Sequence, residues 1–149
     1  MGRRLERWGA LDWKERRRLL GCMLGLPLVQ MSIALSGYTR TRQAIERWSR
    51  HPRPRTASSA EIADAKALAQ LAAIAGRHGA VEATCLRRSL LLYGWLRRRG
   101  LEPALQIGVA EREGPFEAHA WVELEGTPLL ASDADYRPFV SAAEFNPGP

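Results

Sequence analysis

The spacing of apolar and polar residues in the first half of the chain predicts amphipathic helices. In residues 10–24 the apolar positions surround a charged block: Leu11, Leu19, Leu20, Met23 and Leu24. Asp12 precedes Glu15 by three residues, which is the spacing of a capping box at the start of a helix. Pro27 interrupts the next apolar stretch, residues 24–35. We therefore expect two packed helices joined near this proline, and no transmembrane span.

A basic, proline-containing segment then breaks the helical pattern. Helical spacing continues from Thr41 to Trp48 and ends at residues 51–55. Ser58 or Ser59 can cap an alanine-rich helix that follows. Its apolar stripe consists mainly of small residues, which implies close packing against another helix: Ile62, Ala65, Leu68, Ala69 and Ala72. The break predicts a basic helical region at residues 1–55 and a second domain at residues 56–149.

The pattern changes from helical spacing to period two near residue 100. A helix is expected from Thr84 to Arg99, stopped by Gly100. Beyond it come alternating segments at 104–109 and 118–124, a turn at Glu125-Gly126, and a returning segment at 129–131. Helices followed by an antiparallel meander predict the α+β class and argue against a parallel doubly wound sheet.

Composition and charge limit the possible function classes. The 149 residues are 46 % hydrophobic and 26 % charged, as in a soluble globular protein. The net charge of +6 is uneven, because residues 1–55 hold 13 Lys and Arg against 4 Asp and Glu. A solvated basic face explains this as well as a nucleic-acid, lipid or acidic-peptide partner does. We expect no nucleic-acid partner and no membrane contact.

The cysteine pattern favours a free thiol over a structural one. Cys22 and Cys85 form no CxxC motif and no Cys/His cluster with zinc spacing, so we expect neither a disulfide framework, nor a metal, nor a cofactor. No GxGxxG, HExxH or GxSxG motif is present. The start of the chain lacks the pattern of a cleavable signal peptide, which predicts a cytoplasmic location.

Cys85 is the candidate nucleophile. It follows Thr84 at the predicted start of a helix, where the helix dipole lowers the pKa of a thiol and unpaired backbone N–H groups can hold an oxyanion. Arg87 and Arg88 follow directly and also favour the thiolate. The alternative is an inert buried cysteine, which is what most lone cysteines are.

His119 is the candidate base, because it interrupts an otherwise apolar strand and burial of an imidazole requires a partner. A third group should orient its ring, and Asp133, Asp135 and the weaker Ser132 are the candidates. A two-residue turn at Glu125-Gly126 would place Ser132 opposite His119, whereas a three-residue turn would place Asp133 there. We favour Asp133 over Asp135, with solvated turn acids as the alternative for both.

Three strings of this sequence resemble the lasso peptide biosynthesis B2 proteins, which are leader peptidases of the transglutaminase-like cysteine protease superfamily. They are CLRRSLLLYGWLRRRG at residues 85–100, PALQIGV at residues 103–109 and FEAHAWVELEG at residues 116–126. The resemblance covers about residues 60–140, and its specific part is the combination of C-L-x-R-S-L with A-H-A-W-V-E-x-x-G. It implies a papain-like core at residues 56–149, in which the cysteine-bearing helix packs on an antiparallel sheet.

The resemblance also implies an activity and partners. Cys85 matches the nucleophile and His119 the base of a Cys-His-Asp triad that cleaves the leader from a lasso precursor peptide. The third position departs from the family's usual V-L-N-D, since the chain reads LLASD at residues 129–133, so Asp133 is a hypothesis. A separate leader-recognition (B1) protein is implied because residues 1–55 look helical and not like a fused winged helix. The lasso cyclase is a further candidate partner.

Two other functions are compatible with these residues. The same triad could transfer the acyl group to an amine instead of water. Alternatively, the chain could be a non-catalytic module that presents the leader peptide or docks the cyclase.

Overall fold

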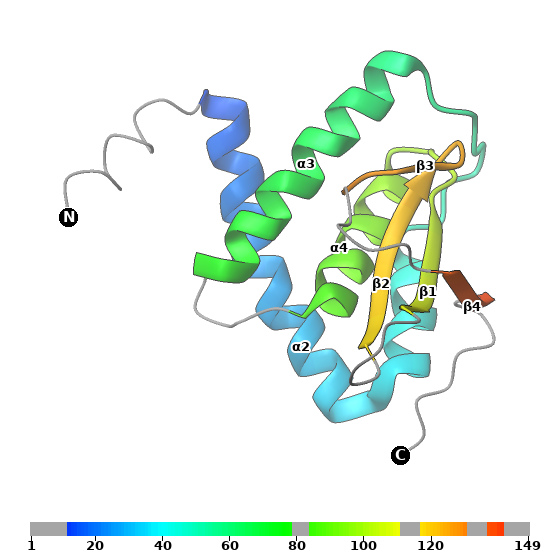
Figure 1. Cartoon of the computed structure of the whole chain (residues 1–149). Helices are drawn as coiled ribbons and strands as arrows, with labels where there is room; N and C mark the ends of the chain where they lie inside the picture. The colour runs from blue at the N-terminus through cyan, green and yellow to red at the C-terminus, as the bar shows by residue number, and fades with distance from the viewer. Residues whose placement is uncertain (1–11, 79–83, 111–116, 131–136, 142–149) are drawn as a thin grey trace.

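The computed structural model describes residues 12–78, 84–110, 117–130 and 137–141. Within these ranges three helices precede a four-stranded antiparallel sheet (Figure 1), which confirms the predicted α+β class. They are α2 (Trp13–Trp48), α3 (Ser59–His78), α4 (Cys85–Arg98), β1 (Ala104–Ala110), β2 (Glu117–Leu124), β3 (Thr127–Pro128) and β4 (Arg137–Ser141). The strand order is β3-β2-β1-β4. Helix α4 packs against α2, α3 and β2, so it links the helical layer to the sheet.

Helix α2 begins as the sequence predicts. The Asp12 side chain caps the first turn, and the Asp12 N–H donates to the Glu15 carboxylate at 3.0 Å, which completes the capping box. The two groups satisfy backbone donors that have no partner within the helix. The start of the helix is therefore determined locally.

The bend in α2 lies ten residues beyond the predicted position. Pro27 sits inside the helix without breaking it, whereas Gly37, at φ 76° and ψ 171°, separates two helical segments. The predicted joint at Pro27 is wrong. The proline removes one backbone hydrogen bond, but burial of Leu26 and Val29 beside it holds the helix in place. The left-handed dihedrals at residue 37 are readily adopted only by glycine.

One face of α2 is buried and the opposite face is apolar and exposed. Leu19, Cys22, Leu26 and Val29 are buried, as expected for a helix that packs against α3 and α4. The exposed large apolar residues of the opposite face are Leu20, Leu24, Leu28, Met31 and Leu35. By length and composition alone α2 could cross a membrane, and 22 % of its most apolar window is buried. The expected absence of membrane contact stays a prediction.

Helix α3 packs through its small residues, as the sequence predicts. Ser58 caps it, since the Ser58 hydroxyl accepts from the Glu61 N–H at 3.3 Å and the Ser58 N–H donates to the Glu61 carboxylate at 3.0 Å. Along the inner face Ala65, Leu68 and Ala69 are completely buried. Side chains this small let α3 approach its neighbours closely. The helix-free segment between α2 and α3 coincides with the predicted boundary, but the division into two domains stays a prediction.

The hairpin between β2 and β3 has a two-residue turn. Glu125 and Gly126 have φ values of 50° and 71°, as in a type I′ turn, and Leu124 pairs with Thr127. The three-residue turn that favoured Asp133 opposite His119 is therefore wrong. Asp133 itself lies in the range 131–136, outside the described residues, together with Ser132 and Asp135.

The strand pattern after this turn also differs from the prediction. β3 contains only Thr127–Pro128, although the Leu129 N–H still donates to the Val122 carbonyl at 3.0 Å. The return strand begins two residues earlier than predicted, at Thr127, and residue 131 of the predicted segment lies outside the described residues. β4 was not predicted, and it pairs with the other edge of β1. Consequently β1 and β2 form the centre of the sheet.

Candidate active site

Cys85 occupies the position that the sequence predicts, at the first residue of α4. Thr84 is the N-cap, with extended dihedrals, but its side chain makes no capping hydrogen bond. The backbone N–H groups of the first turn therefore have no acceptor in the Thr84 side chain. This end of the helix favours negative charge.

His119 reaches the thiol from β2. It pairs across the sheet with Gly108 of β1, a residue without a side chain. Its ring stacks on Trp121, with ring centroids 6.1 Å apart and an interplanar angle of 15°. The Trp121 indole N–H in turn donates to the Glu123 carboxylate at 2.8 Å. The indole thus lies nearly parallel to the imidazole on the same face of β2.

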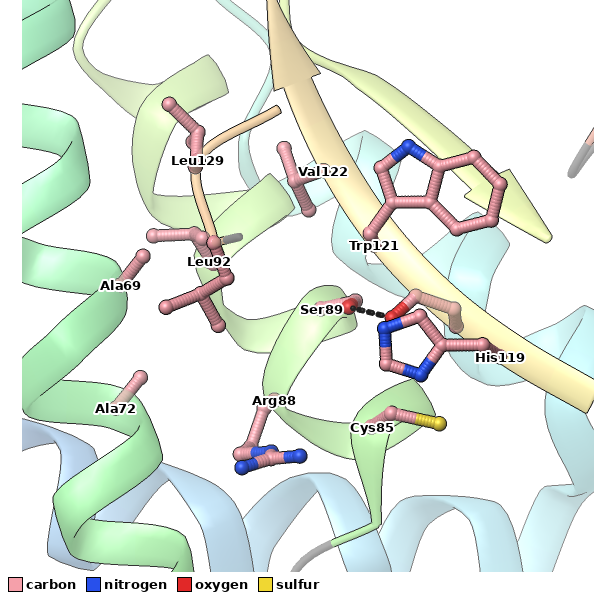
Figure 2. A pocket seen from close by; sticks show the side chains of 12 residues that line it. Ala69, Ala72, Cys85, Arg88, Ser89, Leu92, His119, Trp121, Val122 and Leu129 are labelled. Carbon is pink, nitrogen blue, oxygen red and sulfur yellow. Dashed lines mark hydrogen bonds between the residues drawn. The ribbon is translucent and has the colours of Figure 1, made fainter. Parts of the chain in front are cut away.

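The structure brings Cys85 and His119 together, as the sequence predicts (Figure 2). Burial raises the pKa of the Cys85 thiol, but a hydrogen bond with His119, the Ala120 N–H, the imidazolium charge and the Leu86 N–H all lower it. The net pKa lies below the usual thiol value. These are the conditions that turn a cysteine into a nucleophile.

A serine that sequence reasoning missed ties the two elements together. Ser89, one helical turn after Cys85, donates its hydroxyl hydrogen to the Ala120 carbonyl at 3.0 Å, and both residues are buried (Figure 2). Since Ala120 follows His119, this bond fixes α4 against β2 beside the pair. The available signal was a serine on the otherwise apolar inner face of the helix.

Removing this hydroxyl should separate the reacting groups. We expect Ser89→Ala to lower the free energy of unfolding by about 1–2 kcal/mol, since the buried Ala120 carbonyl loses its donor. We also expect the pH profile of Cys85 alkylation to shift upward, because His119 would no longer be held against the thiol. A loss of stability with an unchanged profile would show that Ser89 only supports the fold. Ser89→Thr, which keeps the hydroxyl, is the control.

The pair faces a small, mostly apolar cavity between α3, α4 and β2, with a volume of about 30 Å³. That volume admits a water molecule or a group of similar size. Its described lining residues are Ala69, Ala72, Cys85, Arg88, Ser89, Leu92, His119, Ala120, Trp121, Val122, Leu129 and Leu130. A mostly apolar lining strengthens the electrostatic interactions within the cavity.

The second cysteine has the opposite environment. Cys22 is 1 % exposed in the core of α2, and burial raises its pKa to about 11. We therefore expect iodoacetamide at pH 7 to modify Cys85 at least about a hundredfold faster than Cys22, because the thiolate is the reacting form. The lowered pKa of Cys85 should preserve labelling as the pH falls below the ordinary thiol pKa, and His119→Ala should remove that advantage. Peptide mass spectrometry at several pH values measures both sites, and equal rates would contradict the assignment.

Asp133 stays a prediction, since it lies outside the described ranges. Within those ranges no group of three or more His, Cys, Asp and Glu side chains is placed to hold a metal ion. The described groups can supply a thiolate nucleophile, an imidazole for proton transfer and backbone N–H donors.

Comparison with known proteins agrees with this geometry. The family model of the transglutaminase-like superfamily matches residues 27–143, well over half of the chain. Searches of curated proteins and of solved structures gave no match. The family match does not distinguish the lasso peptide B2 proteins from the rest of the superfamily. The chain belongs to the transglutaminase-like superfamily, whose members are often cysteine-dependent enzymes.

Proposed function

We propose that this protein is a cysteine peptidase that removes the leader from a lasso peptide precursor. The observation that carries the proposal is the pairing of Cys85, at the start of α4, with His119 of β2. Membership of the transglutaminase-like superfamily supports a cysteine-dependent reaction. The choice of substrate rests on the resemblance of the C-L-x-R-S-L and A-H-A-W-V-E-x-x-G strings to the B2 proteins.

In the first step the Cys85 thiolate attacks the carbonyl carbon of the scissile peptide bond. The new C–S bond places negative charge on the carbonyl oxygen, and the Cys85 N–H at the helix start is the donor that we assign to it. His119 then gives its proton to the departing amine as the C–N bond breaks. The products are the free core peptide and a thioester between the leader and Cys85.

In the second step water releases the leader. His119, now neutral, takes a proton from the attacking water, and the C–S bond breaks to restore the thiol as a leader carboxylate forms. Asp133 would orient the imidazole through its other nitrogen in both steps. The reaction as written requires no cofactor, and we place it in the cytoplasm, where thiols stay reduced.

We further propose that a separate leader-recognition (B1) protein delivers the precursor. The described part of the first 55 residues is helical from Trp13 to Trp48, which favours a separate partner over a recognition domain fused there. The lasso cyclase, which would act on the freed core, is the second proposed partner. Cleavage measured with and without the leader-recognition protein tests the first of these assignments.

The test of the function is mass spectrometry of a lasso precursor incubated with this protein and the leader-recognition protein. Hydrolysis would give a leader that ends in a free carboxylate. A product that forms only when an amine is added, and that contains that amine, would indicate acyl transfer instead. No cleavage by well-folded protein with its partner present would reject the peptidase and favour the docking module.

A further inference from the structure

Within the described residues, one cation of the active-site cavity, Arg88, has no hydrogen-bond or ion-pair partner. Arg88 lies on α4 three residues after Cys85 and lines the cavity that the Cys85–His119 pair faces (Figure 2). Its Nε atom is buried, and the Nε–H donates to no acceptor. Within the described part of the chain the Arg88 side chain forms no hydrogen bond or ion pair. A buried guanidinium donor without an acceptor costs free energy, so its presence calls for an explanation.

Three other partly buried arginines each have an acceptor bonded to the guanidinium. Arg42 also has a buried Nε without a partner, but its guanidinium is held by Glu46 at 2.7 Å. Arg18 pairs with Asp64 at 2.7 Å, and Arg87, the direct neighbour of Arg88, donates to the Gln30 side chain at 3.1 Å. Arg88 therefore differs from these three arginines, because no acceptor in the described part of the chain bonds its guanidinium.

The charges of the residues that line the cavity indicate which kind of ligand group would bind Arg88. A thiolate at Cys85 and an imidazolium at His119 cancel, and no acid is present among the described lining residues. Among the described lining residues, the charge that remains after this cancellation is the positive charge of Arg88. The other lining residues are mostly Ala, Leu and Val, so a carboxylate that enters would meet the guanidinium in apolar surroundings, where charge-assisted hydrogen bonds are strongest.

We infer that Arg88 is a specificity-determining residue that binds a carboxylate of the substrate next to the bond attacked by Cys85. The role as a substrate contact rests on the proposed peptidase function, but the affinity for a carboxylate beside the thiol does not. The planar guanidinium suits a carboxylate because it offers several N–H donors in a fixed arrangement. Burial of the Arg88 Nε–H without an acceptor is unfavourable in the free enzyme, and a bound substrate carboxylate would supply that acceptor.

Paired alkylating reagents test the inference without a peptide substrate. Iodoacetate and iodoacetamide form the same kind of bond to Cys85 and differ mainly in their carboxylate and amide groups. We expect wild-type Cys85 to favour iodoacetate, relative to a free thiol, and Arg88→Met to lower the iodoacetate-to-iodoacetamide rate ratio by about tenfold, the effect of one charge-assisted hydrogen bond. Arg87→Met removes the same charge one residue away and should change the ratio little. Arg88→Lys should restore part of it.

Stability separates this role from a structural one. Because the buried Nε has no partner, Arg88→Met should leave the melting temperature unchanged or raise it. A clearly lower melting temperature, or an equal fall of the ratio in Arg87→Met, would overturn the inference. So would a wild-type ratio no higher than that of a free thiol, the result expected if an acid of the chain, such as Asp133 or Asp135, neutralises Arg88.

The inference and the proposed function can fail separately. If wild type cleaves no precursor but the ratio still depends on Arg88, the carboxylate site stands and the leader-peptidase function falls. If wild type cleaves the precursor and the ratio does not depend on Arg88, the function stands and the carboxylate site falls.

Discussion

Cys85→Ala should abolish cleavage of the precursor, with a fall of at least about 10³-fold in rate. Loss of the nucleophile removes the covalent route, and backbone donors and binding alone leave only a small residual rate. The substitution should not unfold the protein, because Cys85 is half-buried at a helix start and alanine is a good helix former. Mass spectrometry of the precursor with the leader-recognition protein present measures the loss.

The second cysteine supplies the matched control. Cys22→Ala also removes a thiol, but at a buried core position on α2. We expect it to reduce stability somewhat and to leave the cleavage rate of folded protein nearly unchanged. His119→Ala should lose activity about as severely as Cys85→Ala, since the two act as a unit. Full activity in Cys85→Ala would refute the proposed mechanism, and a strong effect of Asp133→Asn would identify the third member of the triad.

Gly37→Val should lower the free energy of unfolding by about 3 kcal/mol. A β-branched residue is strongly disfavoured at φ 76° and ψ 171°. An added Cβ at this position would meet no atom within 4 Å, so the cost would be conformational and not steric crowding by neighbours. If the helix straightened instead, Tyr38 and Thr41 would leave the buried positions they occupy after the bend. Urea-induced unfolding followed by circular dichroism measures the change.

Two substitutions control for side-chain size and for the proline. Ser36→Val places the same side chain on the preceding, exposed helical residue and should cost less than about 1 kcal/mol. Pro27→Ala should be neutral or stabilising, because it restores a backbone N–H inside the helix. A harmless Gly37→Val together with a damaging Pro27→Ala would place the joint at the proline after all.

Local chemistry in the sequence was sufficient to locate the two reacting groups. A cysteine directly after Thr84, before a helical pattern, had to lie at a helix start, and a histidine within an alternating apolar segment had to lie on a strand. The capping box at Asp12 was equally readable, because it involves residues only three positions apart. The sequence left Ser58 and Ser59 open as caps of α3, and the structure selects Ser58. The α+β class followed from the change of period along the chain.

The corrected predictions concern choices that local preference leaves open. Pro27 and Gly37 are both helix breakers by propensity, and the burial of Leu26 and Val29 on one side of the proline decides which of them ends the helix. The turn at Glu125 and Gly126 could have two or three residues until the pairing of β2 with β3 selects one register. Asp133 and Asp135 lie in residues 131–136, outside the described residues, and Asp133 stays a prediction.

The sequence by itself determined the α+β class, the starts of α2, α3 and α4, the two central strands β1 and β2, and the identity of the candidate nucleophile and base. Only the tertiary structure decided that Ser89 bonds to Ala120 and that Cys85 meets His119 with a lowered pKa. It also decided that Arg88 lines the same cavity with no partner among the described residues. The physical reason is the distance along the chain over which each kind of interaction acts. Caps, turns and periodicity act between residues a few positions apart, whereas burial and charge compensation depend on groups that lie far apart in the chain and meet only when α4 packs on β2.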